Sequence, residues 1–267
     1  MSMFLRFFFP PPPSLFVNAM SVFSLVSLSV LGLSEIKGEH LNYSKFWNVE
    51  SQIRRRSSGI KLPSRTGMLV LYTPALLAAL VSFGFLSQDG SLRTLLVSSA
   101  LFIHFLKRDL EVLFIHKYSG AMMLDHAIPI SLSYFFSTVA SFYSQYLSQQ
   151  LPEPSADLKP FGVVLFLIGI AGNFYHHYLL SNLRGKEDRG YKIPKGGLFS
   201  LVICPPYLFE VVGFVGVSCF SQTLYTFCFT LGSFFYLLGR SHATRKWYIA
   251  RFPNFPKQIK SMIPYVF

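Results

Sequence analysis

Four ionisable side chains lie close together in a mainly apolar stretch of this chain, where charge is costly if the stretch crosses a membrane. They are His104, Lys107, Arg108 and Glu111. On a helix these four fall within one stripe about 100° wide, and Lys107 and Glu111 are spaced to pair. Such a stripe can hold charge or donate hydrogen bonds to a ligand. The alternatives are a structural ion pair between helices, or an early end of the membrane core.

A second polar stripe is predicted further along the chain, at Asn173, His176, His177 and Arg184. The two adjacent histidines raise the possibility of a metal site. However, neighbouring helical residues point about 100° apart, and no Cys or carboxylate lies at ligand spacing in the sequence. We therefore predict no metal, and a polar helix face that lines a cavity.

A third candidate group follows two consecutive prolines in Cys204-Pro205-Pro206-Tyr207-Leu208-Phe209-Glu210. Tandem prolines break a helix, and a new helix is predicted to begin near Pro206 with free backbone N–H groups at its start. Tyr207 and Glu210 are three apart and should face the same way. A partner for Glu210 should be basic or a ligand donor, unless Glu210 only caps the helix.

Between the second and third groups lies a basic, glycine-rich segment, residues 184–197. Glycines allow a ligand to approach the backbone closely, and basic side chains neutralise phosphate. The segment matches neither a Walker loop nor a dinucleotide fingerprint. With the charged half of the 94–118 stretch and the basic C-terminal tail, it could surround a polyanionic ligand.

The composition identifies the elements that must position these groups. Of 267 residues, 51% are hydrophobic, 17% aromatic and 13% charged, and the charged share is about half that of a soluble domain. A soluble fold could not solvate its surface, and an unfolded chain this aromatic would collapse. The chain is therefore predicted to be an all-α integral membrane protein. The net charge of +12 does not indicate nucleic-acid binding, because no soluble face is left to carry a basic patch.

Seven apolar stretches are long enough to cross a bilayer. They cover residues 14–33, 66–87, 94–118, 128–147, 161–180, 198–220 and 222–238. A cleaved signal peptide is the alternative for the first stretch, but no small-residue cleavage pattern follows it. Lys and Arg number 1, 7, 1, 3, 1, 5, 0 and 6 along the chain, counted in the segments that flank these stretches except for the fourth number, which is counted in the C-terminal half of the 94–118 stretch. This alternation predicts a lumenal N-terminus and a cytosolic C-terminus, by the rule that cytosolic loops carry the excess of basic residues.

Several motifs between residues 101 and 267 resemble one known family. They are Gly172-Asn173, Leu183-Arg184, the run 191–199, Glu210 and the C-terminal run 247–267. The family is that of the steroid 5α-reductases and trans-2-enoyl-CoA reductases, which are membrane enzymes that use NADPH. The resemblance divides the chain into N-terminal membrane helices with a basic cytosolic loop, residues 1–100, and a catalytic membrane domain, residues 101–267.

The resemblance implies a set of cofactor-binding residues. NADPH would be held by Arg108, Asn173, Arg184, Tyr191, Lys192, Glu210 and Tyr248. Three positions depart from the steroid enzymes, because His177, Pro206 and Thr244 stand where those enzymes have Asp, Asn and His. Arg245 or His242 is expected to substitute for the last of these.

The motifs divide between the two branches of the family. Steroid enzymes pair a Glu and a Tyr around the substrate ketone, and the matching positions here are Tyr72 and Phe105. The enoyl-CoA branch has His-x-x-Lys-Arg-x-x-Glu followed by a His, which matches residues 104–116, and Cys-Pro-x-Tyr-x-x-Glu, which matches residues 204–210. The chain length and the missing N-terminal soluble domain are similar to the steroid branch. Both branches reduce a C=C bond conjugated to a carbonyl group.

The resemblance thus predicts an NADPH-dependent oxidoreductase acting on CH–CH groups of a lipid in the endoplasmic reticulum membrane. Tyr207 and Lys107 are the predicted donors to the carbonyl oxygen, and Glu111 is predicted to orient Lys107 or lower the cost of its charge. The predicted partners are the lipid substrate and the membrane. A transporter, a lipid-binding scaffold and a methyltransferase remain alternatives, and NADPH binding would separate the predicted enzyme from all three.

Overall fold

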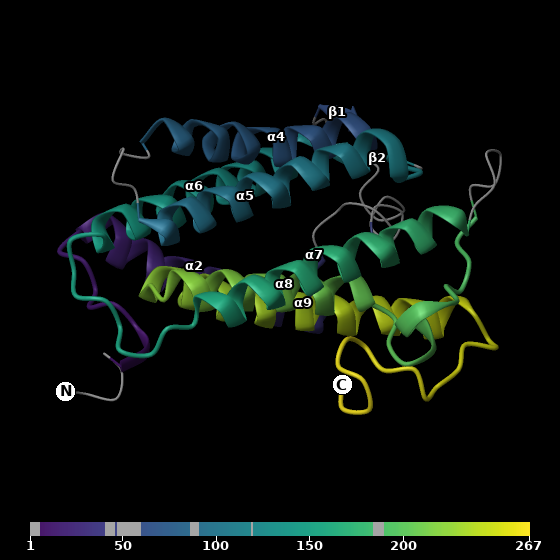
Figure 1. The fold of residues 1–267 in the computed structure, drawn as a ribbon. Helices are drawn as coiled ribbons and strands as arrows, with labels where there is room; N and C mark the ends of the chain where they lie inside the picture. The colour runs from purple at the N-terminus through teal and green to yellow at the C-terminus, as the bar shows by residue number, and fades with distance from the viewer. Residues whose placement is uncertain (1–5, 41–45, 47–59, 86–90, 119, 184–189) are drawn as a thin grey trace.

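The computed structural model describes residues 6–40, 46, 60–85, 91–118, 120–183 and 190–267, and within them the chain forms seven long helices (Figure 1). These helices are α2 (Leu15–Lys37), α4 (Ser64–Ser82), α5 (Leu92–Leu110), α6 (Leu124–Ser148), α7 (Lys159–Asn182), α8 (Pro205–Ser221) and α9 (Leu224–Arg251). Each one overlaps one of the seven stretches predicted from hydropathy. The shorter elements are β1 (Lys61–Pro63), β2 (Ala121–Met123), the 3₁₀ turns η2 (Phe83–Phe85) and η4 (Gly197–Ser200), and the π-helical turn η3 (Glu111–Ile115).

Local sequence explains some of the helix starts. Ser14 caps α2 by accepting a hydrogen bond from the backbone N–H of Val17, and the first predicted stretch begins at this residue. The predicted helix break at the tandem prolines is confirmed, because α8 begins at Pro205. A span that starts at residue 198 is therefore wrong: proline lacks the N–H that would continue a helix, and residues 197–200 form only a 3₁₀ turn. Helix α9 covers most of the predicted stretch 222–238 and continues beyond it to Arg251.

Among the described residues, three helical segments are long and apolar enough to cross a membrane: Leu15–Lys37, Ser64–Phe85 and Lys159–Asn182. Helix α8 is similarly apolar but shorter. Large apolar side chains on their outer faces, including Phe23, Leu77 and Leu167, are more than half exposed. Such surfaces are unfavourable in water and favourable in lipid, so the chain is a membrane protein.

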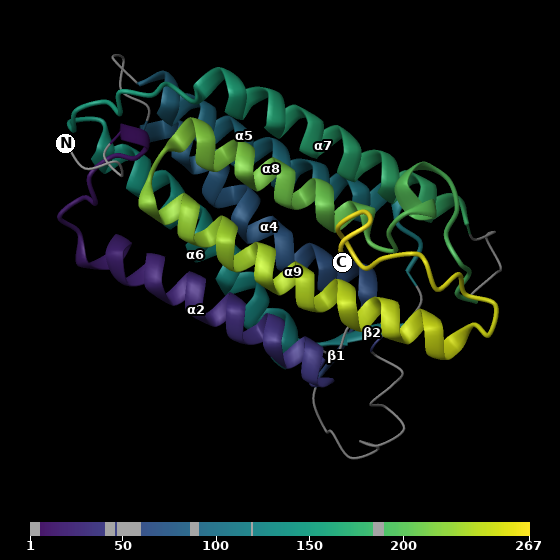
Figure 2. The same cartoon turned by 90° about the horizontal axis from the view of Figure 1, so that it is seen from below.

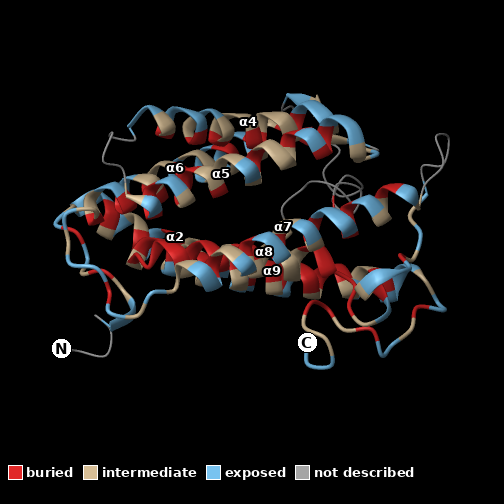
Figure 3. Cartoon of the chain, viewed as in Figure 1, coloured by how far each residue is buried: buried red, intermediate tan, exposed pale blue. Residues whose placement is uncertain are grey.

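The helices pack in two layers. In Figure 1, α4, α5 and α6 lie above α2, α7, α8 and α9. Figure 2 shows the lower layer in the order α7, α8, α9, α2, and the pairs α7–α8 and α2–α9 have the most extensive contacts. Figure 3 shows that buried residues gather on the faces that the two layers turn toward each other.

Glycines bring the helices of the lower layer close together. A Cβ atom built at Gly169 of α7 would overlap the backbone of Gly213 in α8, and one built at Gly239 of α9 would overlap the backbone of Gly32 in α2. Small residues that let helix backbones approach are typical of membrane helix pairs. The lower layer is thus held by close backbone packing.

One end of the bundle is tied by short backbone pairings. Strands β1 and β2 are antiparallel, with Leu62 opposite Met122, so the starts of α4 and α6 lie side by side. The C-terminal tail pairs with the chain just before α8, where Ile203 N donates to the carbonyl of Lys260. These pairings hold the starts of α4, α6 and α8 close to the candidate site.

A buried arginine ties the other end of the bundle. Arg93 is 1% exposed and donates to the Glu153 carboxylate, the Phe220 carbonyl and the Gln222 side chain at 2.8–3.1 Å. The hydrogen bonds from Arg93 hold the pKa of Glu153 below its usual value. This network joins α5 to the α6–α7 and α8–α9 connections.

Candidate functional site

The charged stripe of α5 forms a buried network between the two layers. Lys107 Nζ donates to Glu111 Oε1 at 2.9 Å, which confirms the predicted pair one helical turn apart. Lys107 also donates to the side-chain oxygen of Asn173 on α7. Asn173 in turn donates to the Pro206 carbonyl at 2.8 Å and to Glu210 at 3.4 Å. The network therefore connects α5, α7 and the first turns of α8.

Arg108 forms the second branch of this network. Its Nη1 donates to Glu111 Oε2 at 3.1 Å, and its Nη2 donates to the hydroxyl of Tyr72 on α4 at 2.6 Å. The guanidinium carbon also lies 4.8 Å from the centre of the Tyr72 ring. One carboxylate, Glu111, thus holds two cations, and Arg108 links the network to α4.

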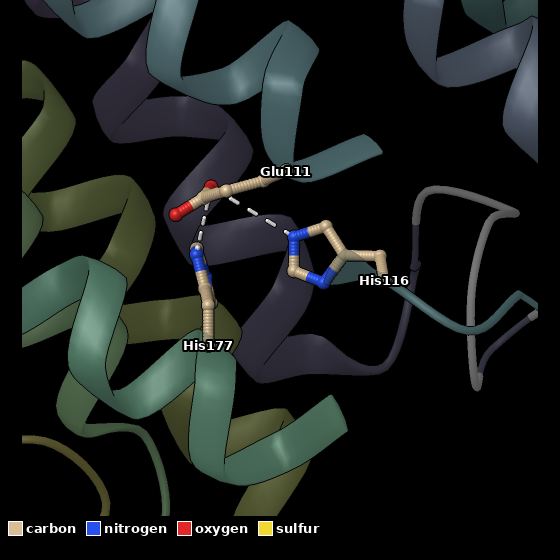
Figure 4. Close-up of side chains that lie close together, drawn as sticks. All are labelled: Glu111, His116 and His177. Carbon is tan, nitrogen blue, oxygen red and sulfur yellow. Dashed lines mark hydrogen bonds and ion pairs between the residues drawn. The ribbon is translucent and has the colours of Figure 1, made fainter. Parts of the chain in front are cut away.

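Two histidines point at the same carboxylate (Figure 4). His177 Nδ1 of α7 lies 3.0 Å from Glu111 Oε2, and His116 Nε2 lies 3.8 Å from it. The π-helical turn η3 begins at Glu111 and ends just before His116, whose backbone N–H donates to the Glu111 carbonyl at 2.7 Å. The fold therefore supplies the carboxylate that the sequence around His176-His177 lacks.

These three residues could offer ligand atoms to a metal ion, since the atoms lie within 4.8 Å of one another. The surrounding charges argue against that use. Glu111 is 1% exposed and already holds Lys107 and Arg108, so a divalent ion would enter beside two cations in a poorly screened interior. The donor set is better suited to an ion-pair network than to a metal.

Two histidines of the predicted polar stripes, His176 and His104, make contacts outside the Glu111 network. His176 Nδ1 lies 2.7 Å from the Gly172 carbonyl, and its Nε2 accepts from Leu198 N at 3.1 Å, so this residue supports the 3₁₀ turn η4. His104 packs on Phe105 and Phe214, with ring centres 5.0 and 5.3 Å away. Neither histidine takes part in the described hydrogen bonds of the Glu111 network.

A polar cavity of about 310 Å³ opens beside the network, at the end of the bundle that holds β1 and β2. Among its described lining residues, Arg108, Lys117, Lys192 and Arg240 are basic and Glu210 alone is acidic. Two further polar atoms in its wall, Arg108 Nε and the Tyr118 hydroxyl, are buried without a hydrogen-bond partner in the described part of the chain. These charges and donors fit an anionic ligand with several phosphate or hydroxyl groups.

Most of the predicted cofactor residues line this polar cavity. They are Arg108, Tyr191, Lys192, Glu210 and Tyr248. Tyr248 at the end of α9 donates to the Lys192 carbonyl at 3.5 Å, and Tyr191 packs on Trp247 with ring centres 4.9 Å apart. Asn173 instead belongs to the neighbouring network, and Arg184 lies outside the described residues.

The predicted catalytic residues are distributed around the site. Tyr207 lines the polar cavity together with Glu210. Lys107 lines a second cavity, described next, and Glu111 lines neither. Glu111 is therefore placed to hold Lys107 and Arg108, not to contact a ligand in either cavity.

The second cavity, of about 390 Å³, is mainly apolar and runs between the two layers. Phe105, Phe166, Phe214 and Phe229 are among the side chains that line it. Six residues line both cavities: Met68, Tyr72, Tyr134, Glu210, Tyr236 and Leu237. The apolar and polar cavities therefore adjoin at a wall rich in tyrosine.

Sequence reasoning missed one residue of this site, Arg240, and named a second, Tyr72, only through its match to a position of the steroid enzymes. Arg240 of α9 lines the polar cavity and is ion-paired with the buried Glu35 of α2. It lies four and eight residues before Thr244 and Tyr248, so a helical stripe through the predicted Tyr248 could have found it. Tyr72 stands out in the sequence only as a departure from a family pattern, and no local motif indicates its contact with Arg108.

The two residues expected to substitute for the histidine of the steroid enzymes at position 244 make other contacts in the structure. Arg245 donates to the tail carbonyls of Ile259 and Lys257 at 2.6 and 2.7 Å, and His242 packs on the C-terminal Phe267. Neither lines the polar cavity. Arg240, one turn earlier on α9, is the described basic residue of that helix that faces it.

Comparisons with known proteins show which family the chain resembles. The family model described as 3-oxo-5-alpha-steroid 4-dehydrogenase matches residues 126–267. The chain is 28% identical to rat 3-oxo-5-alpha-steroid 4-dehydrogenase 1 over 90% of each protein. It is 36% identical to the cotton steroid 5-alpha-reductase DET2 over 40% of this chain and 42% of that protein. It is 30% identical to a very-long-chain enoyl-CoA reductase of Dictyostelium discoideum over 61% of this chain and 55% of that protein.

The helical membrane fold and these matches together define an oxidoreductase that acts on CH–CH groups. More particularly, the chain belongs to the 3-oxo-5-alpha-steroid 4-dehydrogenase family, whose relatives also include enoyl-CoA reductases. The resemblance inferred from the sequence motifs is confirmed.

Proposed function

We propose that this protein reduces a C=C bond conjugated to a carbonyl group in a membrane lipid, using NADPH. The substrate is a trans-2-enoyl thioester or a 3-oxo-Δ4 steroid. The observation that carries the proposal is the pair of adjoining cavities. One is apolar and suits a lipid, the other is basic and suits a phosphate-bearing cofactor, and they share six lining residues. A reaction between the two ligands would take place at that shared wall.

The polar cavity is the proposed cofactor site. Lys192 and Arg108 would neutralise phosphate charge, together with Arg184, which directly follows the cavity residue Leu183 in sequence. Tyr191, Tyr248 and Glu210 would bond or pack against the sugar groups, with Asn173 bonded to Glu210 from the neighbouring network. NADPH, when bound, supplies the hydride that adds to the β-carbon of the conjugated system.

The chain's own residues would stabilise the charge that develops on the substrate. As the β-carbon gains hydride, the substrate becomes an enolate. The negative charge that develops on its oxygen needs hydrogen-bond donors that are already in place. Lys107 can donate from the apolar cavity and Tyr207 from the polar one. Glu111 holds Lys107 at 2.9 Å and so fixes the direction of its ammonium group. The apolar walls would exclude water from the reacting carbons.

Membrane topology is the remaining part of the proposal. We infer seven crossings, a lumenal N-terminus and a cytosolic C-terminus in the endoplasmic reticulum membrane. Basic residues of the polar cavity, including Lys117 and Lys192, lie in segments that the Lys/Arg alternation predicts on the cytosolic side. The cofactor site would then open to the cytosol, and the apolar cavity would lie at the depth of the lipid.

The test is a parallel assay of the purified protein in lipid nanodiscs. NADPH binding is measured directly, and NADPH consumption is followed with a 3-oxo-Δ4 steroid and with a trans-2-enoyl thioester. We expect binding and consumption with at least one substrate class. NADPH binding without turnover on either would reject the reaction, and no binding at all would favour a transporter or scaffold. Phe105→Tyr is the companion variant: steroid reduction that appears only in this variant would exclude a native steroid ketone.

A further inference from the structure

Tyr72 lies where the two cavities meet. It is 5% exposed, and it lines both the apolar and the polar cavity. Lys107 lines only the apolar cavity, Tyr207 lines only the polar one, and Phe105 carries no hydroxyl group. Tyr72 therefore brings a hydroxyl group to the wall where a lipid and a cofactor would come into contact.

A cation holds the Tyr72 hydroxyl. Arg108 Nη2 lies 2.6 Å from the phenol oxygen, and because a guanidinium can only donate hydrogen bonds, this oxygen is the acceptor. The phenol hydrogen is thus directed away from Arg108. A positive charge at this distance stabilises the phenolate that is left when the hydrogen is given up. The pair has the chemistry of a general acid.

Contacts on both sides of Tyr72 fix its position. The Ser131 hydroxyl of α6 donates to the Val70 carbonyl at 2.6 Å, and the Thr73 hydroxyl donates to Asp109 of α5 at 3.0 Å. The Tyr72 ring is stacked on Tyr134 with ring centres 5.6 Å apart. Helix α4 is thereby held against α5 and α6 at the residues that flank Tyr72, and a fixed donor is what acid catalysis requires.

We propose that Tyr72 is the acid that protonates the substrate in the reaction proposed above, on which this inference rests. Hydride addition to the β-carbon breaks the π component of the C=C bond and leaves an enolate. The Tyr72 O–H bond then breaks, and its proton forms the new C–H bond at the α-carbon while the carbonyl is restored. The phenolate remains beside Arg108 and regains a proton from water that enters through the polar cavity.

The test compares three variants in nanodiscs. Tyr72→Phe removes only the hydroxyl group, and Tyr72→Gln keeps an oxygen that can accept from Arg108 but provides no acid. Thr73→Val is the matched control, because it removes the neighbouring hydrogen bond to Asp109 from a residue that lines neither cavity. For each variant kcat, KM and NADPH affinity are measured.

We expect kcat to fall about 100-fold or more in both Tyr72 variants, the usual scale for the loss of a general acid. NADPH affinity should not change, and Thr73→Val should lose far less activity. Near-normal kcat in either Tyr72 variant would overturn the proposal. So would an equal loss in Thr73→Val, which would indicate displacement of α4, or a loss of NADPH binding, which would make Tyr72 a cofactor residue. Failure of the unmutated protein to reduce either substrate would instead reject the proposed function.

Discussion

Glu111→Gln should destabilise the protein strongly, because this carboxylate neutralises two cations whose side chains are only 11% and 13% exposed. Its oxygens lie 2.9 Å from Lys107 Nζ and 3.1 Å from Arg108 Nη1, and its side chain is 1% exposed. Glutamine has nearly the same size, so the change removes charge while leaving little space unfilled. The two cations would then lie close together in the protein interior without their shared counter-ion.

The loss of stability in Glu111→Gln depends on the positive charge of Lys107 and Arg108, which stays largely shielded from solvent without a counter-ion. Breaking a buried ion pair by neutralising one partner costs roughly 3–5 kcal/mol, because a buried charge is left uncompensated. At roughly 2–4 °C per kcal/mol for a chain of this size, the unfolding temperature should fall by about 6–20 °C. Adding Lys107→Met should recover part of this loss, since it removes one of the two uncompensated cations.

Asp109→Asn is the matched control on the same helix. Asp109 is also buried, but it accepts one hydrogen bond from Thr73, and its second oxygen has no partner in the described part of the chain. An amide oxygen can accept the Thr73 hydrogen bond equally well, so the change should be about 1 kcal/mol or less. Both variants are measured by thermal unfolding in one detergent. Equal unfolding temperatures for Glu111→Gln and the unmutated protein would refute the charge argument.

Three further predictions concern packing, catalysis and the cofactor. Gly169→Ala should lower the unfolding temperature, because the added Cβ atom would overlap the backbone of α8. Gly213→Ala should be tolerated, because its Cβ atom would meet only Gly169 Cα, at 3.8 Å. Equal stability of the two variants would argue against the close packing of α7 on α8. Tyr207→Phe should reduce kcat by about 100- to 1000-fold with little change in NADPH affinity, if its hydroxyl stabilises the enolate; full activity would remove it from the reaction. Lys192→Ala should weaken NADPH binding by roughly 10- to 150-fold, as one charge-assisted contact is worth roughly 1.5–3 kcal/mol. Lys159 pairs with Glu153 and Asp157 and lines neither cavity, so the control variant Lys159→Ala should bind NADPH normally. Similar losses of NADPH affinity in both lysine variants would contradict the assignment of the polar cavity.

Helix positions could be predicted from the sequence because they depend on local properties. Runs of apolar residues identified all seven helices, and Ser14 and Pro205 marked two of the helix starts. The Lys107–Glu111 pair was also predictable, since residues four apart are neighbours on any helix. The end of α9 was not predictable by hydropathy, because that helix continues beyond its apolar part to Arg251.

The contacts that define the site could not be predicted in this way. Asn173 and Glu210 were identified by their types, but their contact with each other depends on how α7 packs on α8. The absence of a carboxylate near His177 in the sequence was a misleading signal, because Glu111 reaches it from another helix, 66 residues earlier in the chain. Similarly, the basic residue that faces the polar cavity from α9 is Arg240, and which side of α9 faces inward depends on its packing against α2.

By itself, the sequence determined that this chain is a helical membrane protein of a reductase family, because apolar run lengths and ordered motifs are properties of the chain alone. The tertiary structure decided which of its polar residues share one site. Tyr72 and Arg108 are 36 residues apart and meet only because the β1–β2 pairing and the packing of α4 on α5 and α6 bring them together. The meeting of an apolar and a polar cavity at Tyr72 likewise arises between two helix layers, and no local pattern specifies how two layers pack.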